Sequence, residues 1–175
     1  MNFIRIKDKI INLAQINNAI VDILSHRSNG LSQQEVAVKY NLDRTFISKL
    51  ETFGKIRRSN NIAVIGFPIQ NKDELISILS KNGIIDSLIM TEDEREDFVR
   101  SKNGADLVNE ISQIISYYKK FDIIILLCSD KRNKLLESLF VNEVISIVIG
   151  KSPLSDNIFI DPEMLDEIIK TIKVS

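Results

Sequence analysis

The fold of the N-terminal part of the chain is decided by one stretch, residues 31–54, which reads LSQQEVAVKYNLDRTFISKLETFG. Ser32 and Glu35 form the S-x-x-E pattern of a capping box, in which the serine hydroxyl and the glutamate carboxylate satisfy free backbone N–H groups at the start of a helix. Asp43 is an equally good N-terminal cap for another helix. The stretch therefore predicts a short helix, a tight turn, and a second helix that begins at Arg44.

Two helices that cross at a tight turn need apolar or small residues at fixed positions, and the stretch supplies them. The first helix needs an apolar residue facing the core and a small residue where the second helix crosses it. The turn needs an apolar residue that plugs the bend, and the second helix needs two apolar residues three positions apart on its inner face. The residues that meet these demands, in chain order, are Val36, Ala37, Leu42, Ile47 and Leu50. Asn41 holds the turn position and tolerates a left-handed backbone almost as well as glycine.

The outward positions of the second helix, which is predicted to end at Phe53, are polar or basic and can donate hydrogen bonds to base edges or phosphates. These positions are Arg44, Thr45, Ser48 and Lys49. Lys55, Arg57 and Arg58 follow directly, and they predict phosphate contacts that strengthen DNA binding without specifying a sequence. The alternatives are a solvated linker for this basic run, and an ordinary helical hairpin for the whole stretch.

Residues 31–37 and 43–51 closely resemble the helix-turn-helix of lambda-repressor-like transcriptional regulators, over roughly residues 19–54 of this chain. The resemblance implies that one set of side chains faces DNA, namely Gln33, Gln34, Arg44, Thr45, Ser48 and Lys49. It also implies that Ser32 caps its helix over a DNA phosphate. The remainder of the chain resembles regulators that join a helix-turn-helix to a Rossmann-like domain.

Upstream of this stretch, apolar residues recur at steps of three, four and seven, which is helical spacing. They predict a long first helix that ends at Asn29 and Gly30, with Gly30 as a left-handed cap. The pattern consists of Ile10, Leu13, Ala14, Val21 and Leu24. Phe3, Ile4 and Ile6 make the start of this helix unusually apolar, so it is a candidate surface for a homodimer.

The pattern changes after Arg58 to alternating strands and helices. Four apolar runs have the length and β-branched content of strands buried on both faces of a parallel sheet. These runs cover residues 62–67, 85–90, 123–128 and 144–149, and residues 158–160 offer a fifth. Helical stretches cover residues 72–81, 92–102, 105–119, 131–140 and 162–172. We therefore predict an N-terminal all-α helix-turn-helix domain, residues 1-56, followed by an α/β three-layer domain, residues 57-175, with a mostly parallel sheet of four to five strands.

The net charge of −1 conceals an asymmetry between the two parts of the chain. Residues 1–58 contain ten Lys/Arg and five Asp/Glu, a charge of +5, whereas residues 59–175 contain thirteen Lys/Arg and nineteen Asp/Glu, a charge of −6. A basic segment joined to an acidic one favours a nucleic-acid-binding module attached to a domain of another kind. We expect the acidic part to repel DNA and to leave the basic module as the docking face.

Open α/β sheets bind ligands beyond the carboxyl ends of their strands, so we searched the loops at those ends. Their glycines permit close backbone approach, and their helix starts can receive an anion. The residues predicted for a small-molecule effector are Gly66, Phe67, Asn71, Ser129, Asp130, Gly150 and Lys151. The dinucleotide fingerprint G-x-G-x-x-G and the phosphate loop G-x-x-x-x-G-K-[ST] are both absent from the sequence, so we predict no cofactor. Ordinary turns and helix caps are the alternative interpretation of these loops.

Composition excludes several classes of protein. The longest unbroken apolar run, residues 123–128, is too short to span a bilayer, so no membrane partner is predicted. Cys128 is the one cysteine and His26 the one histidine, which excludes a Cys/His zinc site within one chain and makes a cytoplasmic location the default. No spacing of carboxylates identifies a general acid and base, so we predict no catalytic residue, no metal site and no enzymatic activity.

These features predict a cytoplasmic, sequence-specific transcriptional regulator that binds double-stranded DNA with residues 44–53 in the major groove. A single module contacts few base pairs, so a homodimer on two half-sites is expected. The α/β domain is then expected to dimerise, to bind an effector, or both. The alternatives are a small α/β enzyme with a helical docking module, and a non-catalytic protein-interaction adaptor that uses the same helices without DNA.

Overall fold

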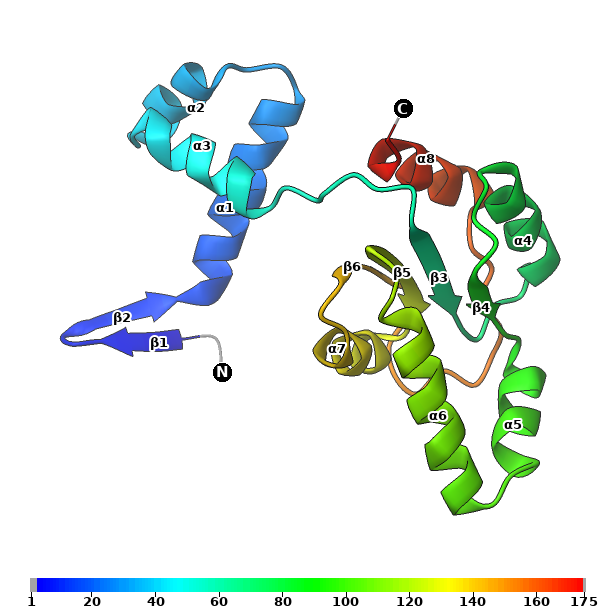
Figure 1. Cartoon of the computed structure of the whole chain (residues 1–175). Helices are drawn as coiled ribbons and strands as arrows, with labels where there is room; N and C mark the ends of the chain where they lie inside the picture. The colour runs from blue at the N-terminus through cyan, green and yellow to red at the C-terminus, as the bar shows by residue number, and fades with distance from the viewer. Residues whose placement is uncertain (1–2, 175) are drawn as a thin grey trace. The chain divides into compact units, whose positions relative to one another are not determined.

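The computed structural model describes residues 3–174 of the chain, which divides into one compact unit ending at Lys55 and another beginning at Ile56 (Figure 1). The first unit contains β1 (Phe3–Ile6), β2 (Lys9–Asn12), α1 (Leu13–Ser28), α2 (Gln33–Tyr40) and α3 (Arg44–Phe53). The second unit contains β3 (Ile62–Gly66), α4 (Lys72–Lys81), β4 (Ser87–Ile89), α5 (Glu92–Arg100), α6 (Gly104–Tyr118), β5 (Ile123–Cys128), α7 (Asp130–Leu139), β6 (Glu143–Val148) and α8 (Pro162–Ile172). Within the described residues, no helix is both long and apolar enough to cross a membrane.

The first unit opens with an antiparallel hairpin, so the expectation of an all-α first domain is wrong in this respect. β1 pairs with β2, and Ile4 lies opposite Ile11 in the register. Lys7 turns the chain with a φ of +54°, a conformation that hairpin turns usually assign to Gly, Asn or Asp. α1 begins only after the hairpin, where the side-chain oxygen of Asn12 accepts hydrogen bonds from the first free N–H groups of the helix.

The two helices predicted from residues 31–54 form with the expected bounds. Ser32 and Glu35 make the predicted capping box at the start of α2, with the Glu35 N–H donating to the Ser32 hydroxyl over 3.2 Å. Asn41 ends α2 in the left-handed conformation, with a φ of +51°. Asp43 then caps α3, as predicted from the sequence.

A small core holds α1, α2 and α3 together. Its four buried side chains are Ile23, Val36, Ala37 and Ile47. Leu50 packs partly buried against them, as the pattern requires. Leu42 is 39% exposed, so the prediction that it plugs the turn is wrong. Its backbone carries the turn instead, because its N–H bonds to the Ala37 carbonyl over 2.9 Å.

The apolar pattern predicted for the first helix is carried only in part by α1, because Ile10 lies in β2. Ile23 is the buried residue of this helix, whereas Val21 and Leu24 are exposed. The apolar residues recur at helical spacing without all facing the small core. Much of the apolar surface of α1 therefore remains open to solvent in a single chain.

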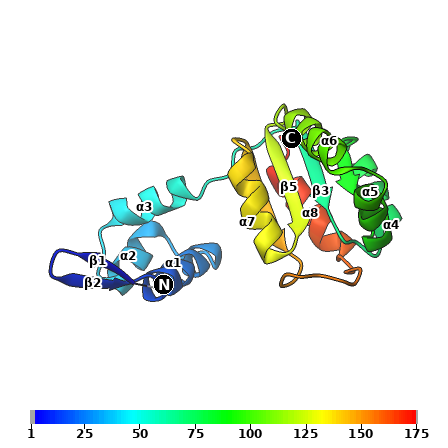
Figure 2. The same ribbon diagram turned by 90° about the horizontal axis from the view of Figure 1, so that it is seen from below.

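The second unit is an α/β domain built on a parallel sheet of four strands in the order β4-β3-β5-β6. Every residue of β3 and β5 is buried, which is why their sequences show no polar alternation. Alternate side chains point to opposite faces, so Val64 packs with α4 and α8 while Ile65 packs with α6 and α7. Figure 2 shows helices on both sides of the sheet. The expected fifth strand is reduced to a single parallel bridge between Ile69 and Ile158.

The strand order sets where a ligand could enter. From β3 the chain passes to β4 on one side of the sheet, and β5 lies on the other side of β3. At such a reversal of strand order the two connections leave a crevice at the carboxyl ends of the strands. In this unit that crevice lies at the ends of β3 and β5.

Asn71 ties the loop after β3 to the segment that enters α8. Its Nδ2 donates to the Ile160 carbonyl over 2.8 Å, and its Oδ1 accepts from the Ile160 N–H over 3.0 Å. Ile160 is buried, so both backbone groups depend on this amide. The residue that sequence reasoning assigned to an effector thus has a structural role.

We expect Asn71→Ala to lower the free energy of unfolding of the second unit by about 1–3 kcal/mol, because it leaves buried backbone groups of Ile160 without partners. Urea unfolding of the full chain measures the loss. The exposed neighbour Gln70 provides the control, and Gln70→Ala should change stability by less than about 0.5 kcal/mol. Equal stability of the two variants would contradict the structural role of Asn71.

Candidate nucleic-acid interface

The exposed face of α3 carries the side chains that were predicted to meet DNA. Arg44, Thr45, Ser48 and Lys49 are all exposed, whereas Ile47 of the same helix is fully buried. The helix thus presents a polar and basic side to solvent and its apolar side to α1 and α2. This arrangement brings four of the predicted residues onto one face.

Asp43 organises the start of α3. Its carboxylate accepts hydrogen bonds from the Thr45 N–H, over 2.6 Å, and from the Thr45 hydroxyl. These bonds, the hydroxyl contact foremost, hold the pKa of Asp43 below its usual value. The Thr45 hydroxyl is therefore engaged with the helix cap rather than directed outward.

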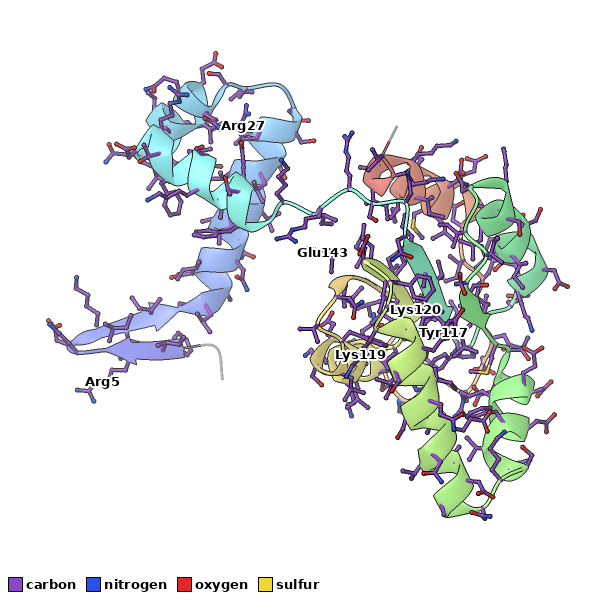
Figure 3. All side chains as sticks on the ribbon, viewed as in Figure 1. Arg5, Arg27, Tyr117, Lys119, Lys120 and Glu143 are labelled. Atoms are coloured by element: carbon purple, nitrogen blue, oxygen red, sulfur yellow. The ribbon has the colours of Figure 1, made fainter. Side chains whose placement is uncertain are left out.

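A polar network connects the three helices behind this face. The Arg27 side chain lies among the helices of the first unit (Figure 3), and its Nε contacts Glu51 Oε1 over 2.5 Å. The second carboxylate oxygen of Glu51 accepts a hydrogen bond of 2.8 Å from Gln33 Nε2. The carbonyl end of the Gln33 amide accepts from Arg44 Nε over 3.4 Å. Arg27 of α1 and Arg44 of α3 are thereby linked through Glu51 and Gln33.

This network changes the interpretation of Gln33. Both ends of its amide are used within the protein, and the side chain is half-buried. Gln33 is therefore a positioning residue, which holds the guanidinium of Arg44 at the start of α3. Ser32 and Gln34 are exposed at the start of α2, beside it.

Arg27 and Glu51 were missed by sequence reasoning. They lie 24 positions apart on different helices, and no local pattern connects residues at that distance. Only the packing of α1 against α3 brings the two charges together. Hydrogen bonds from Arg27, and then from Gln33, hold the pKa of Glu51 below its ordinary value.

The basic run after α3 is divided between the two units. Lys55 is the exposed last residue of the first unit, and Arg57 and Arg58 belong to the second. Both arginines line an open depression of about 730 Å³, together with Lys119 and Glu143. Figure 3 labels Lys119 and Glu143. The depression mixes basic and acidic groups, which gives it no clear preference for an anion.

Two glycines predicted for the effector site instead allow close packing. A Cβ at Gly66 would lie 3.1 Å from the Leu127 Cβ, and one at Gly150 would lie 2.9 Å from Leu154 Cδ2. Those distances are tighter than side chains normally tolerate, so glycine suits both positions. Neither glycine lines either of the two described cavities.

Two further predicted effector residues fasten the loop after β6. The buried Ser129 hydroxyl bonds to the Ser152 hydroxyl over 2.7 Å. The Asp130 carboxylate accepts from the Ser152 N–H over 2.7 Å, and this bond holds the pKa of Asp130 below its usual value. Lys151 is exposed on the same loop. Phe67 is the one predicted effector residue that lines a described cavity.

Cys128 ends β5 inside the core. Burial raises the pKa of its thiol to about 11, so the thiolate needed for nucleophilic or redox chemistry is scarce near neutral pH. The residue fills space in the sheet as a small apolar side chain.

Comparisons of the chain with protein-family models, with curated proteins and with solved structures found no match. The functional argument therefore rests on the geometry of the two units and on the chemistry of their exposed side chains.

We expect the stability of the first unit to depend on pH through Glu51. Because the folded-state pKa lies below the ordinary value of 4.5, the carboxylate stabilises the unit above that value. The stabilisation is lost as the pH falls below 4.5 and through the lowered pKa. Hydrogen-exchange protection of α3 amides in the full chain should decline over this range.

Glu51→Gln should reduce protection of these amides at pH 7 and flatten their dependence on pH. Glu96→Gln is the matched control, because Glu96 pairs with Arg100 on the exposed surface of the second unit. An α3 profile in Glu51→Gln that coincides with wild type would show that the network does not stabilise the helices.

Proposed function

We propose that the chain is a sequence-specific, DNA-binding transcriptional regulator of the cytoplasm that inserts α3 into the major groove. The observation that carries this proposal is the exposed polar face of α3, with Arg44 at its first position and Ile47 buried on its opposite side. Helix-turn-helix proteins place the N-terminal residues of the second helix against base edges. Arg44 stands where such a contact requires a long donor.

The chemistry of Arg44 fits guanine. A guanidinium can donate two parallel hydrogen bonds to the O6 and N7 atoms of guanine in the major groove. Gln33 accepts a hydrogen bond only from Nε of this guanidinium. The Gln33 amide therefore orients the Arg44 guanidinium from one side. A prearranged side chain loses less conformational freedom on binding, which favours affinity.

The backbone of DNA would be held by the residues around α3. Ser32 and Gln34 lie at the N-terminus of α2, where free N–H groups and the helix dipole favour a phosphate. Lys49 and Lys55 add positive charge on exposed positions. The charge of +5 over residues 1–58 supplies attraction that does not depend on sequence.

The partner of the hairpin in this proposal is a second copy of the chain. A lone two-stranded hairpin is marginally stable in water, and every residue of β1 is exposed. Ile4 and Ile6 share one face of the hairpin with Ile11. Ile4 is 48% exposed and Ile6 is 57% exposed. Packing this face of the hairpin against the same face of a second copy would bury its isoleucines. The two α3 helices of the dimer would then be related by a two-fold axis.

α1 carries a second exposed apolar stripe. Apolar residues follow one another along it at steps of three, four and four, which is the spacing of a helix-packing seam. They are Leu13, Ile16, Ile20 and Leu24. Each is at least partly exposed in the single chain, so the seam is free to pack against another helix.

Arg44→Ala should weaken binding to a duplex selected by the wild-type protein by about 1–3 kcal/mol, or roughly 5- to 150-fold, and should relax the preference for one base pair. Fluorescence anisotropy at physiological salt measures both effects. Arg100→Ala, on the exposed surface of α5, changes the charge equally and should leave affinity unchanged. Equal binding by Arg44→Ala and wild type would overturn the groove assignment.

Lys55→Ala separates sequence-independent phosphate contacts from sequence-specific base contacts. It should weaken binding to all duplexes alike and reduce the slope of log affinity against log salt by about 1. If the chain shows no salt-dependent binding to any duplex, the result would instead support a function as a protein-interaction adaptor.

The double variant Ile6→Lys/Ile16→Asp should convert the homodimer to a monomer, because it places charges in the apolar surface of the hairpin and α1. Sedimentation velocity of the full chain measures the change. Val141→Asp is the control, since Val141 is 94% exposed in the second unit. An unchanged dimer in the double variant would place the interface elsewhere.

A further inference from the structure

The second unit contains a partly open apolar cavity of about 310 Å³ on the face of the sheet that α6 and α7 cover. It is lined by side chains from α5, α6 and α7 and from the ends of β3 and β4, among them Leu88, Phe98, Ile111, Ile115 and Leu136. Its volume lies at the lower end of the range of small-molecule sites, about 300–1,000 Å³. Only two charged side chains, Arg95 and Arg132, line it.

Arg132 is the polar group of this cavity that lacks a partner. It lies in the first turn of α7, and its guanidinium carbon is 5.4 Å from the centre of the Phe67 ring. Its Nη1 is buried, and the N–H groups of this atom donate to no protein acceptor within residues 3–174. A buried charged donor without an acceptor is costly, so the site favours a molecule that supplies one.

Arg95 differs from Arg132 because its charge is already matched. Its Nε donates to Glu92 Oε2 over 2.8 Å, and a second contact joins its Nη2 to Glu92 Oε1. These bonds hold the pKa of Glu92 below its ordinary value. Glu92 also attracts Arg132 electrostatically, but its hydrogen bonds go to Arg95, so Arg132 Nη1 stays without an acceptor at the wall of the cavity.

The cavity also lies where the topology predicts a ligand. Phe67 and Met90 follow the carboxyl ends of β3 and β4, and Arg132 follows β5. The order of strands reverses at this edge of the sheet. Sequence reasoning reached this edge through Phe67 but assigned the anion to the helix starts at Asn71 and Ser129. The side chains of these two residues are engaged with Ile160 and Ser152.

We propose that the cavity binds a small monocarboxylic acid with an apolar body. The carboxylate accepts hydrogen bonds from Arg132 Nη1, and the hydrocarbon or aromatic body packs among the side chains of α5, α6 and α7. A single negative charge matches the one unpaired guanidinium, whereas a phosphate dianion would bring a second charge into an apolar site. Use of this acid as an effector rests on the proposed function, but its binding does not.

Calorimetric titration of the full chain with octanoate, without DNA, tests the binding. Octan-1-ol is the matched ligand, because it has the same chain length and no charge. We expect octanoate to bind at least about tenfold more tightly than octan-1-ol, since a hydrogen bond to a charged group contributes more than one to a neutral group. Octanoate, 4-phenylbutyrate and benzoate all failing to bind would overturn the proposal.

Two variants separate the charge from the cavity. Arg132→Met keeps an apolar side chain of similar length and should abolish the preference for octanoate over octan-1-ol, whereas Lys134→Met, on the exposed side of the same helix, should retain it. Val99→Trp fills the cavity from its exposed rim and should weaken both ligands at least about tenfold. An undiminished preference in Arg132→Met, with its fold verified by circular dichroism, would overturn the role of Arg132.

The ligand measurement and the DNA measurement test the two proposals separately, so either proposal can be overturned without the other. Octanoate binding by a chain that binds no duplex supports the cavity and removes the regulator. Duplex binding by a chain that ignores all three acids supports the regulator and removes the cavity ligand.

Discussion

The packing of Ile23, Val36, Ala37 and Ile47 is the constraint on which the first unit depends, because these four side chains form the buried core of its described residues. A core of this size leaves little stability to spare in so short a segment. The network from Arg27 through Glu51 and Gln33 therefore has a double consequence. It ties the three helices together, and it sets the direction of Arg44 on the surface that we assign to DNA.

The second unit has the opposite character. β3 and β5 are buried throughout, and helices cover both faces of the sheet (Figure 2). Loops at the carboxyl ends are fastened by side chains such as Asn71 and Asp130, so they act as structural ties. The apolar cavity beside Arg132 is the part of this edge where a buried N–H donor lacks a hydrogen-bond acceptor. The acidic charge of this part of the chain makes it a poor surface for DNA, which fits a division of tasks between the units.

Local signals predicted much of this fold. Caps at Ser32 and Asp43 marked the starts of α2 and α3, because their side chains satisfy neighbouring N–H groups and need no distant partner. The continuous apolar runs identified the strands of the parallel sheet. The hairpin was missed because short apolar segments fit helix and strand periods alike, and because Lys7 gives no hairpin-turn signal.

Features that depend on tertiary contact were beyond sequence reasoning. The pairing of Arg27 with Glu51 and the cavity beside Arg132 arise only when separate helices pack. Leu42 faces solvent because its backbone, not its side chain, completes the turn. Gln33 was predicted as a DNA contact from its position, and its bonds to Glu51 and Arg44 became visible only in three dimensions.

Selection of bound sequences from random duplex DNA, with the full chain at physiological salt, tests the central claim most directly. A homodimer that reads the major groove with α3 predicts an enriched palindrome whose half-sites lie about 10–10.5 base pairs apart, or a multiple of that distance. Recovery of random sequences, with no enrichment over the starting pool, would contradict the claim that this chain reads DNA.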